Sequence, residues 1–139
     1  MQINMNLTVG QRTLRSLHVS EDMVRAYAQL SGDYNPLHFD KEFISQTNFK
    51  GLIAQGGIAT SLIHALVAMD MPGPGSVFLN QNWKFPNPVH INDTITAEAV
   101  VTSVSKQRSI AKMAITVTDE SGKKVLSGDV TVMQTFKNH

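Results

Sequence analysis

The sequence predicts a single α+β domain that combines an antiparallel β-sheet with one buried helix. Residues Ile58 to Met69 would be apolar on almost every side of a helix, which is typical of a helix enclosed by other structure. From Ser76 onward, stretches of strand-like residues follow one another with short turns between them. Strands joined in this way pair antiparallel, so these patterns indicate an α+β domain in which the sheet packs against the apolar helix.

The first part of the chain is expected to supply one strand and two short helices. Arg12 to Val19 suits a first strand. Ser20 is a suitable N-cap for the helix that follows, because two acidic residues come next in its first turn, and Gly32 suits its C-terminal end. Pro36 disfavours a helical conformation just before it and so predicts a shaped turn, after which Asp40 is placed to cap a short helix.

The second part contains the apolar helix and the remaining strands. Gly56-Gly57 opens the helix, and Pro72-Gly73-Pro74-Gly75 ends it. The strand-like stretches that follow share an alternating or Thr- and Val-rich pattern, and they cover residues 77–85, 94–104, 109–118 and 125–135, with a hairpin turn at 119–122.

Composition narrows the class of protein. The 139 residues suit one compact domain covering residues 1–139, and a net charge of +1 gives no electrostatic basis for binding nucleic acid or a membrane surface. The absence of cysteine excludes disulfides, a cysteine-based zinc site and a cysteine nucleophile, and the histidine spacing suggests no metal site. The N-terminus has no basic start followed by an apolar run, and the longest apolar run is too short to span a bilayer. We therefore expect a cytoplasmic protein.

A carboxylate and an imidazole lie five residues apart around Pro36, in the segment Gly32-Asp33-Tyr34-Asn35-Pro36-Leu37-His38. Such a turn can direct both side chains into one cleft, where Asp33 and His38 would divide the proton transfers needed to add water to a conjugated alkene. Aspartate and asparagine beside glycine and proline are also ordinary turn residues, and a single histidine is more often structural than catalytic. This segment alone favours the structural interpretation.

A second segment shifts the interpretation from a structural role toward a catalytic one. Gly56 and Gly57 would leave backbone N–H groups free at the start of the apolar helix, with no side chain to obstruct a ligand. Placed at a thioester oxygen, these groups would stabilise an enolate. Two adjacent glycines can also serve only close packing of the helix end.

Together, the two segments resemble the MaoC-like family of (R)-specific enoyl-CoA hydratases, within the wider group of hot-dog folds. The resemblance runs from about Val19 to Val132, and its most specific part is the hydratase motif from Ala28 to Asp40. Other family features match the segments 53–58, 72–75, 84–85 and 88–94. The resemblance implies a single MaoC-like hot-dog domain, in which the antiparallel β-sheet wraps around the buried central α-helix and the helix fills its concave face.

The resemblance also implies roles for particular residues. Asp33 and His38 would hold and activate water and handle the proton at the α-carbon, Asn35 would support the same site, and the backbone at Gly56 would form the oxyanion hole. The product would be an (R)-3-hydroxyacyl thioester, with no metal or redox cofactor. Gln55 stands where many relatives have histidine, which puts rate and preferred substrate in question rather than the reaction type.

Further expectations concern the substrate and its surroundings. Gln55 and Ser61 are candidates for contact with substrate, although a serine in a helix usually bonds a backbone carbonyl. The substrate would be a thioester of CoA or acyl carrier protein, and the protein is expected to form a homodimer or a larger homo-oligomer. Two alternatives remain: a hot-dog thioesterase, and a non-catalytic acyl-binding subunit. The thioesterase is disfavoured because no carboxylate lies between Gln55 and Asp70, and the binding subunit because Asp33 and His38 are both present.

Overall fold

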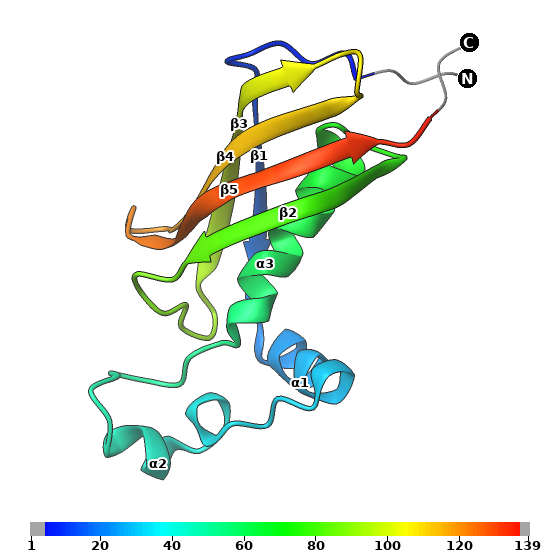
Figure 1. Cartoon of the computed structure of the whole chain (residues 1–139). Helices are drawn as coiled ribbons and strands as arrows, with labels where there is room; N and C mark the ends of the chain where they lie inside the picture. Colours follow the sequence, from blue (N-terminus) through cyan, green and yellow to red (C-terminus); the bar gives the residue numbers. More distant parts are fainter. Residues whose placement is uncertain (1–4, 137–139) are drawn as a thin grey trace.

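The structure, a computed structural model, describes residues 5–136, so residues 1–4 and 137–139 of the predicted domain lie outside the described part. Five strands form one antiparallel sheet in the order β1-β3-β4-β5-β2 (Figure 1). The strands span, in chain order, Arg12–His18, Ser76–Lys84, Thr94–Ser105, Ile110–Asp119 and Lys124–Gln134. The α+β fold predicted from the sequence is confirmed.

Helix α1 (Glu21–Ser31) begins and ends as its sequence predicts. The Ser20 side chain accepts a hydrogen bond from the Met23 N–H, and Gly32 adopts a left-handed conformation at the C-terminal end, with φ +83°. A short 3-10 turn, η1 (Pro36–His38), follows, and Asp40 caps helix α2 (Lys41–Ser45) by accepting from the Phe43 N–H. These caps hold the turn that carries Asp33 and His38.

Helix α3 (Gly56–Ala65) lies across the concave face of the sheet (Figure 1). Its side chains Ile58, Leu62 and Ile63 pack with the inward-facing residues of β3 and β4 in one core cluster. At Leu66 the helix widens into a π-helical turn, η2 (Leu66–Asp70), which keeps Leu66 and Val67 fully buried.

The prediction that this helix is buried on all sides is wrong for the single chain. Ser61 and His64 are exposed on the face turned away from the sheet, and so is Met69 near the end of η2. The sheet curls around one side of α3 and leaves the other side uncovered, because β1 and β2 are the two edges of an open sheet.

One irregular pairing connects the motif turn (residues 32–38) to the segment that leads into α3. The Ala54 N–H donates to the Val89 carbonyl at 2.7 Å, and Ile53 forms an isolated antiparallel bridge with His90. The Ile53 N–H donates in turn to the Leu37 carbonyl at 3.1 Å. Residues 53 to 55 are therefore held between the motif turn and the connection from β2 to β3, immediately before α3.

Within residues 5–136, no helix combines the length and the apolar character required to cross a bilayer.

Candidate active site

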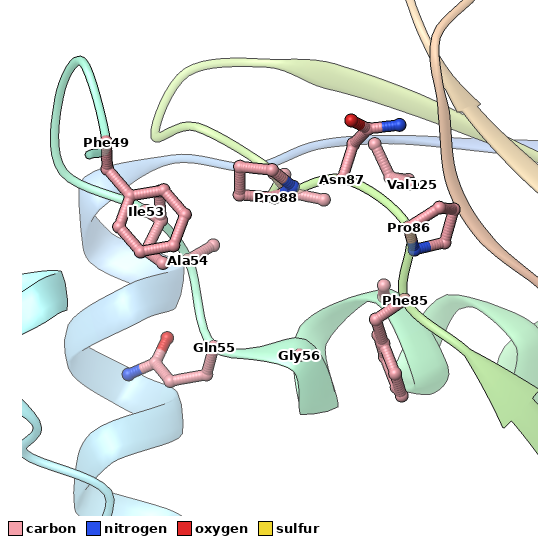
Figure 2. Close-up of a pocket in the computed structure, with 12 residues that line it drawn as sticks. Phe49, Ile53, Ala54, Gln55, Gly56, Phe85, Pro86, Asn87, Pro88 and Val125 are labelled. Carbon is pink, nitrogen blue, oxygen red and sulfur yellow. The ribbon is translucent and has the colours of Figure 1, made fainter.

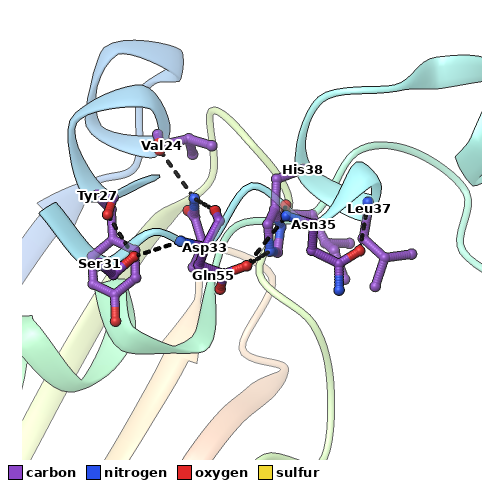
Figure 3. Close-up of polar contacts among 9 residues, drawn as sticks. Val24, Tyr27, Ser31, Asp33, Asn35, Leu37, His38 and Gln55 are labelled. Atoms are coloured by element: carbon purple, nitrogen blue, oxygen red, sulfur yellow. Dashed lines mark hydrogen bonds and ion pairs between the residues drawn. The ribbon is translucent and has the colours of Figure 1, made fainter. Parts of the chain in front are cut away.

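The structure brings Asp33 and His38 together. Asp33 Oδ1 lies 3.5 Å from His38 Nε2. The imidazole is buried, with 7% of its side chain exposed, whereas 42% of the Asp33 side chain is open to solvent. The pair thus joins a fixed imidazole to a carboxylate that water can reach (Figure 3).

The hydrogen bonds of His38 define which of its ring nitrogens is available for chemistry. Nδ1 lies 2.6 Å from the Ile53 carbonyl oxygen, and because a carbonyl only accepts, Nδ1 must carry the hydrogen. Nε2 is then the nitrogen that gains or loses a proton, and it is the one that faces Asp33. The turn therefore presents one exchangeable nitrogen to one carboxylate.

Short-range hydrogen bonds shape the turn around this pair. The Asp33 N–H donates to Ser31 Oγ at 3.1 Å, and Asp33 Oδ1 accepts from the Asn35 N–H at 3.3 Å. Ser31 in turn donates to the Tyr27 carbonyl in α1. The start of the turn is thereby fastened to the last turn of α1.

Asn35 has a structural task at this point. Its Oδ1 accepts from the Leu37 N–H at 3.1 Å and so caps η1, and its side chain points toward Leu37 rather than toward the carboxylate (Figure 3). It supports the site by shaping the turn that carries His38, and any further role of its amide nitrogen stays a prediction.

The N-terminus of α3 borders a cleft of about 420 Å³, which is within the size range of small-molecule sites (Figure 2). Its lining is mostly apolar and includes Phe49, Ala54, Gly56 and Phe85. Helix geometry leaves the first N–H groups of α3 without an intrahelical acceptor, and the N-cap residue Gln55 forms no side-chain cap. These donors are suited to a developing negative charge.

The two glycines differ in their surroundings. Gly56 is exposed, and a Cβ built on it would lie 3.3 Å from the ring of Phe85. A Cβ on Gly57 would overlap the hydroxyl and ring of Tyr27. Gly56 therefore faces the cleft, while Gly57 makes room for the packing of α1 on α3.

Neither Asp33 nor His38 lines the 420 Å³ cleft. His38 instead lines a smaller cavity of about 160 Å³ together with Val24 and Leu52. The segment from Ile53 to Gln55 connects the two regions, because it borders the cleft and its Ile53 carbonyl also holds His38.

The remaining candidates do not line the 420 Å³ cleft with their side chains. The Gln55 side chain points away from the cleft toward α1 (Figure 2), and its backbone borders the cleft. Ser61 is exposed and donates to the Ile58 carbonyl at 2.6 Å. It borders a separate apolar hollow of about 390 Å³ with Met23 and Leu30.

Sequence reasoning missed two contributors to the site. Tyr27 covers Gly57, and the Ile53 backbone carbonyl orients His38. Residue types do not reveal a contact made by a backbone carbonyl. For Tyr27 the only signal, a weak one, was an aromatic residue one turn before Ser31 in the predicted helix. Among residues 5–136, no group of three or more histidine or acidic side chains is arranged to hold a metal ion.

Comparison with known proteins identifies the family to which this chain is similar. The model of the MaoC-like domain matches residues 6–123. The chain is similar to the (R)-specific enoyl-CoA hydratase of Aeromonas caviae, with 35% identity over 127 residues that cover 91% of this chain and 95% of that protein. It is 36% identical over 124 residues to the (R)-specific enoyl-CoA hydratase of Rhodospirillum rubrum, covering 89% and 85% of the two chains. An R-hydratase structure from Pseudomonas aeruginosa superimposes with a TM-score of 0.89 at 32% identity, covering 98% of this chain and 88% of that one.

Proposed function

The chain belongs to the MaoC-like family, and on this premise we propose that it catalyses the reversible (R)-specific addition of water to 2-enoyl thioesters. The hydro-lyase class predicted from the sequence is that of its relatives. The observation that carries the proposal is the 3.5 Å approach of Asp33 Oδ1 to His38 Nε2, with Nδ1 committed to the Ile53 carbonyl.

The pair supplies a balanced set of proton transfers. The Asp33 carboxylate takes a proton from water, whose oxygen forms a bond to the β-carbon of the enoyl group. The electrons of the double bond move toward the thioester carbonyl, and His38 donates its Nε2 proton to the α-carbon. Return of the proton from Asp33 to His38 Nε2 across 3.5 Å, directly or through a water, restores the starting state.

The developing enolate needs a hydrogen-bond donor, and the backbone N–H of Gly56 at the start of α3 offers one. Gly56 lacks a side chain on the cleft side, and the helix dipole adds partial positive charge at the same end. The thioester oxygen would therefore bind at Gly56, with the β-carbon directed toward Asp33.

A thioesterase is the nearest alternative, and the position of Asp70 weighs against it. Asp70 is the first acidic residue after Gln55, and it lies at the far end of η2. Both of its carboxylate oxygens accept from Arg15 Nη1, at 3.0 and 3.1 Å. No carboxylate along α3 is thus placed to activate water against a thioester at Gly56.

The substrate carrier, assembly and cellular location are part of the same proposal. The names of the two curated relatives favour a CoA thioester as substrate. A homodimer would cover the open face of α3 and the unpaired edge of β2, since an uncovered edge strand is a liability. The proposed location is the cytoplasm, as expected from the sequence.

The direct test is hydration of a series of 2-enoyl-CoA thioesters of increasing chain length, followed as loss of the conjugated thioester absorbance. The expected product is the (R)-3-hydroxyacyl-CoA, identified by chiral chromatography after hydrolysis. Release of free CoA without hydration would instead establish the thioesterase. Tight binding of an enoyl-CoA with no turnover would indicate an acyl-binding subunit.

A further inference from the structure

The Gln55 side chain connects α1 to the residue that carries the catalytic carboxylate. It is almost completely buried, with 2% of the residue exposed. Its Nε2 donates to the Val24 carbonyl in α1 at 3.0 Å and to the Asp33 carbonyl at 3.4 Å (Figure 3). One amide group thereby bridges two backbone segments that are separate in the sequence.

The orientation of this amide follows from its neighbours. The NH₂ group has two hydrogens and faces two carbonyl oxygens, whereas the reversed amide would turn its own oxygen toward both of them. In the observed orientation, Gln55 Oε1 is buried and has no hydrogen-bond partner within the described residues. A buried polar group without a partner is unfavourable, so packing alone does not explain a glutamine at this position.

The neighbours of Gln55 in the chain handle the other parts of the site. The Ile53 carbonyl holds His38 Nδ1, and Gly56 begins α3 at the edge of the cleft. The Gln55 side chain holds the backbone of Asp33. Residues 53 to 56 therefore touch the imidazole, the residue carrying the carboxylate and the helix N-terminus, all within one short segment.

We propose that Gln55 is a positioning residue, which places the Asp33 carboxylate relative to His38 Nε2 and the N-terminus of α3 without touching the substrate. This inference rests on the hydratase function proposed above. The other side-chain hydrogen bond to the Asp33 backbone comes from Ser31. Because Ser31 lies in α1, this bond does not depend on the position of α3. Of these two contacts, only the one from Gln55 fixes the position of Asp33 relative to the segment that leads into α3.

The first test replaces the two donors without changing the volume greatly. Gln55→Met should lower kcat about 10- to 100-fold, because displacement of a catalytic group by about 1 Å costs up to 10²-fold. The KM for a short 2-enoyl-CoA should change by less than about threefold, since substrate binding itself is untouched. Gln55→His supplies a ring N–H donor and should recover most of the lost kcat.

A double-mutant cycle separates positioning from a general structural effect. In an Asp33→Asn background, Gln55→Met should produce little further loss of kcat, because the group that it positions no longer acts as a base. An equal fold-loss in both backgrounds would overturn the inference and leave a purely structural role. Circular dichroism and Tm establish that each variant is folded, and Gln55→Asn, whose shorter amide cannot reach both carbonyls, replaces Gln55→Met in the cycle if the latter does not fold.

The outcomes distinguish this inference from the function on which it rests. Wild-type protein that hydrates no enoyl-CoA contradicts the proposed function. If the wild-type protein is active and a folded Gln55→Met variant has a normal kcat, the result contradicts only the proposed role of Gln55. A large rise in KM with unchanged kcat would also contradict it, because that result places the Gln55 side chain against the substrate.

Discussion

Asp33 Oδ1 lies 3.5 Å from Nε2 of His38, yet the two side chains differ in their surroundings, because the imidazole is buried and the carboxylate is partly exposed. The Ile53 carbonyl fixes the imidazole through Nδ1, so His38 has one orientation and one exchangeable nitrogen. The carboxylate depends on the hydrogen bonds to its own backbone for its position. His38 is therefore held through Nδ1 and Asp33 through its backbone, while Nε2 and Oδ1 face each other.

Removal of either reactive group should abolish most of the activity. We expect Asp33→Asn and His38→Ala each to lower kcat by roughly 10²- to 10⁴-fold, the usual contribution of a positioned acid or base. The measurement is the hydration rate of one 2-enoyl-CoA at saturation. His18→Ala is a suitable control, because His18 is exposed on β1 and bonds only Thr94 within the described residues. Folded variants of Asp33 or His38 with near-normal rates would refute the assignment.

Side chains added at Gly56 should reduce turnover in proportion to their bulk. A Cβ at this position would lie 3.3 Å from Phe85, so alanine should be tolerated with a partial loss, whereas valine should crowd the cleft and its backbone donor. We expect Gly56→Val to lose about 10²- to 10³-fold in kcat, the cost of one oxyanion donor. A folded Gly56→Val variant with normal turnover would mean that the thioester oxygen binds elsewhere.

Gly57 should matter for stability more than for chemistry. A methyl group there would overlap the hydroxyl and ring of Tyr27, and such overpacking typically costs about 1–3 kcal/mol. We expect Gly57→Ala to lower the free energy of unfolding in urea by that amount. Gly51→Ala is the matched control, because the nearest atom to its added Cβ, in His90, is 4.0 Å away. Equal stabilities of the two variants would show that Tyr27 moves aside without cost.

The turn between β4 and β5 should respond to pH through Asp119. A hydrogen bond from the Ser121 hydroxyl is the main cause that lowers the pKa of Asp119 below its ordinary value, helped by the backbone N–H groups of Lys123 and Ser121 and opposed by burial. Since the folded pKa is depressed, the ionised form stabilises the fold at pH values above the ordinary pKa, and this contribution disappears as the pH falls through the folded pKa.

The corresponding experiment compares Asp119→Asn with the wild type. At pH 7 the variant should be less stable by about 1 kcal/mol, because it loses charge-assisted hydrogen bonds at the turn. The difference should shrink in denaturant unfolding as the pH falls below about 4, because the unfolded carboxyl is then protonated near its ordinary pKa and the folded carboxyl follows at lower pH. A difference that stays constant from pH 7 to pH 3 would contradict the role of ionised Asp119.

The assembly state should be visible in solution. The uncovered face of α3 and the unpaired edge of β2 predict a homodimer or larger homo-oligomer. Light scattering at assay concentration should therefore give at least twice the 15.3 kDa of one chain. A mass equal to one chain would contradict the prediction.

Much of the fold was predictable because its signals are local. Ser20, Gly32 and Asp40 mark helix ends through contacts within a few residues, and the strand-like patterns placed all five strands close to their observed bounds. The strand order was less accessible. Strand β2 pairs with β5 rather than with the next strand in the chain, and such pairing depends on contacts between distant residues.

The candidate site, too, was predictable only in part. The motif from Gly32 to His38 identified a carboxylate and an imidazole on one turn, since both the residue types and the effect of Pro36 are written in the sequence. The sequence did not show that α3 leaves Ser61 and His64 exposed, because apolar composition reports a preference for burial and not what covers each face.

By itself, then, the sequence determined the class of fold and the helix ends, which follow from residue type and short-range spacing, and it marked Asp33 and His38 as the candidate reactive pair. Only the tertiary structure decided that the Ile53 carbonyl selects the reactive nitrogen of His38, and that Gln55 turns away from the cleft to hold the Asp33 backbone. Those contacts join segments 15 and 22 residues apart. They depend on how the strand-like segment before α3 packs between α1 and the β2–β3 connection, and no pattern of residue types encodes where a backbone carbonyl will lie.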